Sequence, residues 1–251
     1  MGVVGLAIAG RASVPENGGG LPPASAVAQI VVNLAPIGLA LLLAGTHDKP
    51  TAADFGLRRP PLGRAIMLLL AVLIGLTALT GLWISALGLD GEEGQALTER
   101  AGTEGPLTVI VLVIVLTILA PLQEEFLFRG YIFRALRNGY SLWPAAVATA
   151  LLFAATHVGW IPISLIVPVV VFGIGLCLLY HWTASLYPGI ALHAIGSSIP
   201  LAAALHWTWQ TPALVVGSTL AALTLARLLA LVLGDRCPTE TARTPHHESP
   251  T

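Results

Sequence analysis

Two adjacent glutamates and an arginine stand at the end of an otherwise apolar segment. Glu124, Glu125 and Arg129 follow eighteen residues, Pro106 to Gln123, that carry no charge. On a helix, Glu125 and Arg129 are one turn apart and can pair, whereas Glu124 is turned about 100° away. Glu124 is therefore predicted to be the carboxylate without a local partner, able to accept a proton from water. The alternative interpretation is a buried ion-pair cluster that only fixes helix packing.

Two histidines in later apolar segments are further candidates for chemistry. His157 ends the sequence FAATH, where Phe153 lies one helical turn earlier, and His193 precedes Ser197 by four residues. Histidine can exchange a proton near neutral pH. A lone histidine inside a span is nevertheless more often a packed, hydrogen-bonded residue, and a serine in a membrane helix often bonds to a carbonyl of the preceding turn.

The composition places these side chains inside a membrane. Hydrophobic residues make up 55% of the 251 residues and charged residues 10%, whereas soluble domains carry about 25% charged residues. Ala65 to Leu89 contains no charge over 25 residues, and a membrane span needs roughly 20 apolar residues. Because an ionisable side chain within a span is costly, such a residue is a functional candidate by default.

The apolar segments predict an all-α fold, a polytopic transmembrane bundle of about seven helices. Unsatisfied backbone groups are costly in hydrocarbon, so spans of this length are helices. The predicted helices cover residues 24–45, 65–89, 106–138, 142–161, 163–180, 184–205 and 212–234. We interpret residues 1–23 as a flexible lead, 24–234 as one transmembrane domain with its motif core at 106–205, and 235–251 as a disordered cytoplasmic tail.

The third and fourth predicted helices form a hairpin that brings two of the candidates to one depth. Glu124 lies 14 residues before Asn138, and His157 lies 16 residues after Ser141. At 1.5 Å per residue both are roughly 20 Å from the turn, inside a hydrocarbon core about 30 Å thick. The hairpin therefore predicts that the glutamate and the histidine face the same layer of the membrane.

Basic residues predict the orientation of the chain in a cell membrane. One side of the predicted spans carries eight of them and the other side carries only Arg11 and Arg100. By the positive-inside rule, the N-terminus is outside and the C-terminus is cytoplasmic. A net charge of −1 argues against nucleic acid as a partner. The eight are Lys49, Arg58, Arg59, Arg64, Arg134, Arg137, Arg236 and Arg243.

Three motifs fall in order on three of the predicted helices. They are EExxxR at Glu124, Glu125 and Arg129, FxxxH at Phe153 and His157, and HxxxS at His193 and Ser197. They resemble the EExxxR, FxxxH and HxxxN motifs of the CPBP family, also called the Abi family, of CAAX proteases and bacteriocin-processing enzymes. The stretch EEFLFRGYIFRAL is also typical of that family, and the resemblance covers about residues 51–205.

The resemblance implies a bacterial intramembrane endopeptidase in which a glutamate and a histidine activate water. By position, Glu124 would be the base and His157 would orient the water or share its proton. The pair Glu125 and Arg129, with Phe153, would support the site, and the third motif would stabilise the oxyanion. Ser197 departs from the family pattern, because a hydroxyl donates one hydrogen bond and reaches less far than an asparagine amide.

Other functions fit the same residues. The chain could be a non-catalytic membrane protein for bacteriocin self-immunity or partner binding, an alternative that Ser197 keeps open. Two histidines and a glutamate can also bind zinc, but the chain has no HExxH and the ligands would come from three helices, so no cofactor or metal is predicted. A proton-relaying transporter is a weaker alternative. The expected partners are the lipid bilayer and a peptide or membrane-protein substrate.

Overall fold

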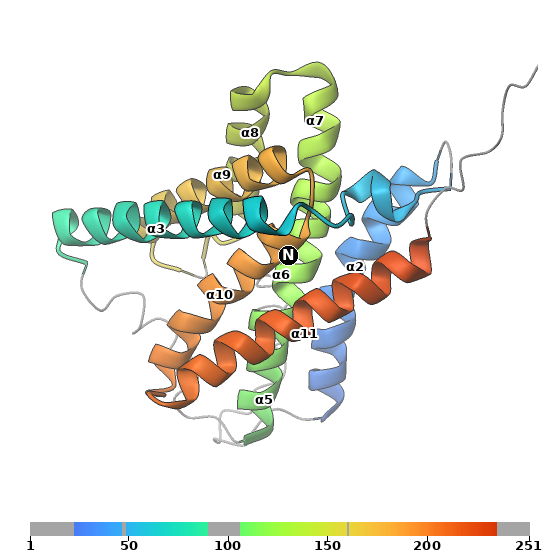
Figure 1. Cartoon of the computed structure of the whole chain (residues 1–251). Coiled ribbons are helices and arrows are strands. Elements are labelled where there is room, and N and C mark those ends of the chain that lie inside the picture. The colour runs from blue at the N-terminus through green and yellow to red at the C-terminus, as the bar shows by residue number, and fades with distance from the viewer. Residues whose placement is uncertain (1–22, 47–48, 90–105, 160, 235–251) are drawn as a thin grey trace, which may run out of the picture.

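The computed structural model describes residues 23–46, 49–89, 106–159 and 161–234, and within these residues it forms helices and no strand (Figure 1). The all-α prediction is confirmed. The predicted flexible lead, the predicted disordered tail, and the basic residues Arg11, Arg100, Arg236 and Arg243 fall wholly or almost wholly outside the described residues. The long helices are α2 (Pro23–Ala44), α3 (Leu62–Leu87), the segments between Pro106 and Gly139, α8 (Leu142–Ala155), α9 (Ile166–Thr183), α10 (Tyr187–Ala204) and α11 (Gln210–Leu233).

Four helical segments are long and apolar enough to cross a membrane by themselves. They are Leu62–Leu87, Pro106–Gly139, Ile163–Thr183 and Gln210–Leu233, and α8 and residues 30–44 of α2 are shorter apolar helices. Only 6% of the residues in the most apolar part of α3 are buried in the protein. A helix that is apolar all round and barely covered by its neighbours is suited to contact lipid. The described chain is therefore a membrane protein whose seven helices include four clear spans.

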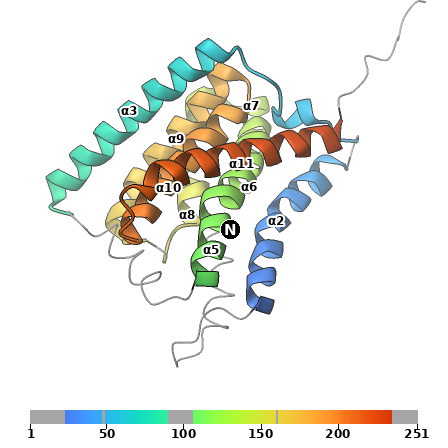
Figure 2. The same cartoon turned by 60° about the horizontal axis from the view of Figure 1, so that its bottom comes forward.

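The predicted third helix is a continuous rod through the middle of the bundle, shown in green in Figures 1 and 2. As predicted, it continues past the two glutamates. Half of the residues in its most apolar part are buried in the protein. Two of its segments are π-helical, with wider turns that frequently occur at functional sites. The rod consists of α5 (Pro106–Ile114), η2 (Val115–Leu119), α6 (Ala120–Glu124), η3 (Glu125–Phe133) and α7 (Arg134–Gly139).

The fourth helix is shorter than predicted, because α8 ends at Ala155 rather than near residue 161. The hydroxyl of Thr156 donates to the Phe153 carbonyl at 2.7 Å, which offers the last turn a side-chain partner. Gly159 then has φ +84°, in a region that favours glycine, and Pro162 follows. A 3-10 turn, η4 (Ile163–Leu165), leads into α9.

The connection between α2 and α3 is an ordered part of the core. We call residues 51–58 the knot segment. It contains the 3-10 helix η1 (Ala52–Phe55), whose capping box joins the Asp54 carboxylate to the Thr51 backbone N–H at 2.8 Å and to the Thr51 hydroxyl at 2.7 Å. The Phe55 ring stacks on Phe126 of η3 with centroids 4.2 Å apart.

Hydrogen bonds attach the knot segment to several helix ends. They join the Ala52 N–H to the Gly234 carbonyl, the Leu186 N–H to the Gly56 carbonyl, the Ser185 hydroxyl to the Arg58 carbonyl, and the Arg134 guanidinium to the Ala53 carbonyl. The end of α11, the turn between α9 and α10, and α7 are therefore held together beside the helix that carries the glutamates.

Candidate active site

Arg129 is fully buried and binds residues from three helices. Its Nη1 donates to Oε1 of Glu125 at 2.7 Å, and its Nη2 donates to the Gly173 carbonyl of α9 at 3.0 Å. The guanidinium carbon also lies 4.6 Å from the centre of the Phe153 ring of α8, a distance typical of a cation–π contact. The ion pair expected from the spacing of Glu125 and Arg129 is present. The Arg129 guanidinium also joins η3 to α8 and α9.

His193 of α10 lies between the two glutamates. Its Nδ1 is 3.0 Å from Oε1 of Glu125, and its Nε2 is 3.7 Å from Oε2 of Glu124. Because an ionised carboxylate only accepts hydrogen bonds, Nδ1 carries a hydrogen and donates it to Glu125. The second separation is longer than a hydrogen bond, so Nε2 faces the Glu124 carboxylate across a short gap.

Of the two glutamates in the site, Glu124 makes fewer hydrogen bonds to protein than Glu125. Its side chain is only 2% exposed, and its Oε1 has no hydrogen-bond partner among the described residues. Arg129 is engaged by Glu125 and Gly173. The geometry thus separates the two carboxylates: Glu125 is held by a cation and a histidine, and Glu124 has an oxygen free to bind another group.

Glu124, Glu125, Arg129 and His193 form one buried cluster of ionisable side chains. Within it, hydrogen bonds join Glu125 to Arg129 and to His193. Nε2 of His193 and the Glu124 carboxylate lie beside each other without a hydrogen bond between them.

His157 lies in the turn after α8 and is half-buried. Its Nδ1 is 3.0 Å from the Phe153 carbonyl. A carbonyl only accepts, so Nδ1 donates and Nε2 is left as a hydrogen-bond acceptor. The rings of His157 and His193 both pack on Phe153. The structure therefore brings the second motif near the first and third without a direct hydrogen bond between them.

The ring of Phe153 touches all three motifs. It lies 4.8 Å from the His157 ring and 5.8 Å from the His193 ring, in addition to its contact with Arg129. Phe153 itself is 1% exposed. Its ring therefore lies between the two imidazoles and the guanidinium and contacts all three.

Ser197 does not join the cluster through a hydrogen bond. It is half-buried, one helical turn after His193, and its hydroxyl has no partner among the described residues. The next residue, Ser198, instead donates to the Ala194 carbonyl at 2.7 Å and lies 2.8 Å from the Ser218 hydroxyl. The helix back-bond considered for Ser197 is therefore made by Ser198, and the Ser197 hydroxyl remains available.

Three further residues of α9 and α10 shape the site, and the two of α9 were not predicted from the sequence. Phe172 packs edge-on against His193 with centroids 5.3 Å apart, and Gly173 supplies the carbonyl that binds Arg129. At Gly189, a Cβ would lie 2.9 Å from Oε2 of Glu125. No local signal identifies these residues, because their contacts depend on how α9 and α10 pack against the rod.

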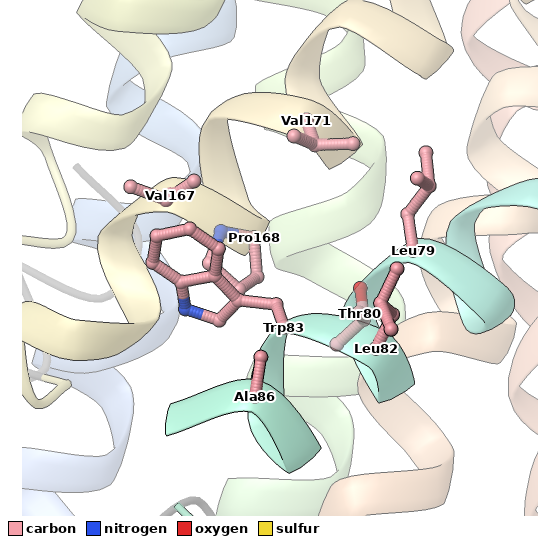
Figure 3. Close-up of a pocket in the computed structure, with 8 residues that line it drawn as sticks. All are labelled: Leu79, Thr80, Leu82, Trp83, Ala86, Val167, Pro168 and Val171. Carbon is pink, nitrogen blue, oxygen red and sulfur yellow. The ribbon is translucent and has the colours of Figure 1, made fainter.

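A cavity of about 330 Å³ lies between α3 and α9, away from the motif residues (Figure 3). Apart from Thr80 its lining is apolar, and it contains no ionisable side chain. Val171 lines it, whereas the next residue, Phe172, contacts His193. Helix α9 thus borders both the cavity and the site. The lining residues are Leu79, Thr80, Leu82, Trp83, Ala86, Val167, Pro168 and Val171.

The described residues contain no group of three or more His, Cys, Asp or Glu side chains arranged to hold a metal ion. The zinc alternative needs Glu124, His157 and His193 to converge on one point. These three side chains do not form such a group. Nδ1 of both histidines is engaged with protein oxygens, which leaves Nε2 as the atom that a metal ion would bind.

Comparison with known proteins points to one family. Residues 106–199, from the start of α5 to α10, match the family model described as type II CAAX prenyl endopeptidase Rce1-like. An uncharacterized 24.3 kDa protein of Escherichia coli is 45% identical over 51 residues, which are 20% of this chain and 24% of that relative. The match thus spans about a quarter of the relative's length, and no solved structure matches the chain. Residues 106–199 carry all three motifs, so the resemblance to CAAX protease-like proteins stated from the sequence is confirmed over this part of the chain.

Proposed function

We propose that this protein is a CAAX prenyl protease-like intramembrane endopeptidase that hydrolyses peptide bonds of membrane-associated peptides or proteins. One observation carries the proposal. Glu124 is a buried carboxylate with an unpartnered oxygen, while the adjacent Glu125 is held by Arg129 and His193. A purely structural cluster would use both carboxylates as partners, whereas a hydrolase needs one that is free to bind water.

In the proposed reaction, Glu124 removes a proton from a water molecule as the water oxygen bonds to the scissile carbonyl carbon. The Nε2 atom of His157 accepts the other hydrogen of that water, since Nδ1 is already engaged by the Phe153 carbonyl. When the carbon–nitrogen bond breaks, the proton held by Glu124 passes to the leaving amine. The products are a carboxylic acid and an amine, and Glu124 returns to its ionised form.

His193 and Ser197 are proposed to stabilise the oxyanion. Glu125 holds Nδ1 of His193, which fixes the ring so that a protonated Nε2 is directed towards Glu124 and the reacting atoms. The unpartnered Ser197 hydroxyl can donate a second hydrogen bond. Removal of one oxyanion donor lowers rates by about 10² to 10³, so serine in place of asparagine is expected to give slow turnover.

The test is processing of membrane-inserted peptides by the purified protein in lipid vesicles, with new peptide ends read by mass spectrometry. Glu124→Gln and His157→Ala are each expected to lower the rate by about 10² or more. The exposed His181 at the end of α9 gives a matched control, and His181→Ala should leave the rate unchanged. Unchanged processing by Glu124→Gln would reject the proposal.

We propose that this hydrolysis needs no metal ion. Every step above uses side chains of the chain, and the described residues contain no group of three or more His, Cys, Asp or Glu side chains arranged to hold a metal ion. Processing is expected to continue after dialysis against a chelator, and purified protein should contain less than stoichiometric zinc. Loss of activity with the chelator and its return with added zinc would contradict this.

The alternative is a protein that binds a peptide or partner without cleaving it. It is supported by the same departure at Ser197. In that case Glu124→Gln would retain immunity or partner binding in cells, because the amide has the size of the carboxyl group. Loss of cellular function together with loss of processing would support the peptidase.

A further inference from the structure

Gln123, the residue before Glu124, has a buried side chain without hydrogen bonds. Its side chain is fully buried, and neither Nε2 nor Oε1 has a partner among the described residues. A carboxamide that has left water without replacing its hydrogen bonds is destabilising. Nearly all buried polar groups in native proteins have a partner in protein or ordered water. Gln123 therefore requires a partner other than the described protein atoms.

Helices α2, α10 and α11 all pack on α6, which carries Gln123. The buried hydroxyls of Ser198 and Ser218 bind each other, and no described side chain hydrogen-bonds to Gln123. A small polar molecule can supply the missing partner, and water is the one always present.

The adjacent residue supplies the other half of a water site. Oε1 of Glu124 is likewise buried without a partner among the described residues. Side chains at consecutive helix positions diverge by about 100°, so a molecule that contacts both must lie in the angle between them. The Nε2–H group of Gln123 can donate to a water whose own hydrogen is donated to Oε1 of Glu124. A buried water is retained where two to four polar partners surround it, and these two residues provide a donor and an acceptor.

We propose that Gln123 is a positioning residue that holds a buried water against Oε1 of Glu124. This inference rests on the proposed function for its catalytic meaning, since the water so held is the one that Glu124 would deprotonate. Gln123 contributes no proton and touches no substrate atom. It fixes the water oxygen by donating from Nε2, so that the lone pair of Glu124 meets a hydrogen of that water.

The test compares Gln123→Met with Leu122→Met. Methionine has nearly the length of glutamine but no hydrogen-bonding amide, and Leu122 is a buried neighbour in the apolar core. Infrared absorption of the Glu124 carboxyl group, assigned by its disappearance in Glu124→Gln, reports hydrogen bonding to that group without any substrate. Gln123→Met should shift this band and its response to deuterated water, and Leu122→Met should not.

The kinetic arm separates positioning from a structural role. Gln123→Met is expected to lower kcat about 10-fold, a modest share of a general-base effect, with KM nearly unchanged, and Gln123→Asn should recover part of the loss.

An unchanged infrared band together with a higher Tm in Gln123→Met would overturn the proposal, because it would mean that the amide is simply an unsatisfied group. If Glu124→Gln lowers processing and Gln123→Met leaves both kcat and the band unchanged, the function stands and this inference fails. If Glu124→Gln has no effect on processing, the peptidase proposal fails, and the infrared arm alone decides whether the water is present.

Discussion

Oε1 of Glu125 lies 3.0 Å from Nδ1 of His193, although the two residues are 68 positions apart in the chain. The same oxygen accepts the hydrogen bond from Arg129 at 2.7 Å. The second glutamate thus connects the first motif to the third and fixes the tautomer of the histidine. This arrangement assigns different tasks to two neighbouring residues of the same type, and the predictions below depend on that difference.

The two glutamates should respond oppositely to neutralisation. Glu125→Gln leaves the buried Arg129 without its anion, and breaking a buried ion pair costs about 3–5 kcal/mol of unfolding free energy. Glu124→Gln removes a carboxylate that has no hydrogen bond to protein, so stability should be unchanged or higher. Denaturant unfolding of the two variants in the same detergent measures both effects. Equal destabilisation would show that the carboxylates share one structural role.

Gly189 should tolerate no side chain. An added Cβ would stand 2.9 Å from Oε2 of Glu125, so Gly189→Ala should displace that carboxylate from His193, lower processing, and destabilise the fold by about 1–3 kcal/mol. Gly217 of α11 is the matched control, because nothing lies within 4 Å of a Cβ there. Gly217→Ala should be neutral or stabilising, since alanine favours helices. A Gly189→Ala protein with normal rate and Tm would show that Glu125 can move without consequence.

Ser197→Asn should raise turnover. The half-buried hydroxyl is unpaired, and an amide at this position reaches further along the face that carries His193. We expect kcat to rise about 10-fold or more, within the range that one oxyanion donor contributes, and Ser197→Ala to lower it. Both are measured in the vesicle assay. If neither substitution changes kcat, position 197 takes no part in the reaction.

The orientation inferred from the basic residues is testable apart from activity. The C-terminus is expected in the cytoplasm, because Lys/Arg-rich loops remain on that side of the membrane. A reporter enzyme that works only in the cytoplasm should therefore be active when it is joined after residue 251. Activity of a periplasm-dependent reporter at the same position would reverse the topology. The result also determines which side of the membrane the proposed substrate approaches from.

Local sequence signals predicted the features that depend on one helix. Apolar length predicts the seven helices and the continuation of the rod beyond Glu125. One-turn spacing predicts the pairing of Glu125 with Arg129. The early end of α8 was missed because the hydroxyl of Thr156 and the conformation of Gly159 outweigh the apolarity of the following residues. Apolar character alone does not separate a helix from an extended loop buried in protein.

Features that depend on contacts between helices could not be predicted from local sequence signals. The π-helical turns of η2 and η3 change side-chain directions along the rod, but apolar length and one-turn spacing do not separate a π-helix from an α-helix. The contacts of Phe172 and Gly173 with His193 and Arg129 join residues that are separated by 20 or more positions. Only the packing of α9 against the rod brings them together, so neither residue carried a recognisable motif.

The knot segment has a practical consequence for protein engineering. A loop between two membrane helices is the usual choice for an epitope tag, a crosslinker or a fluorescent label. Between α2 and α3, however, backbone hydrogen bonds reach Gly234 and Leu186, and Phe55 is stacked on Phe126 beside the glutamates. An insertion there would disturb the core rather than lengthen a tether. The connection between α10 and α11, where Trp209 is 79% exposed, is the better place to attach a probe.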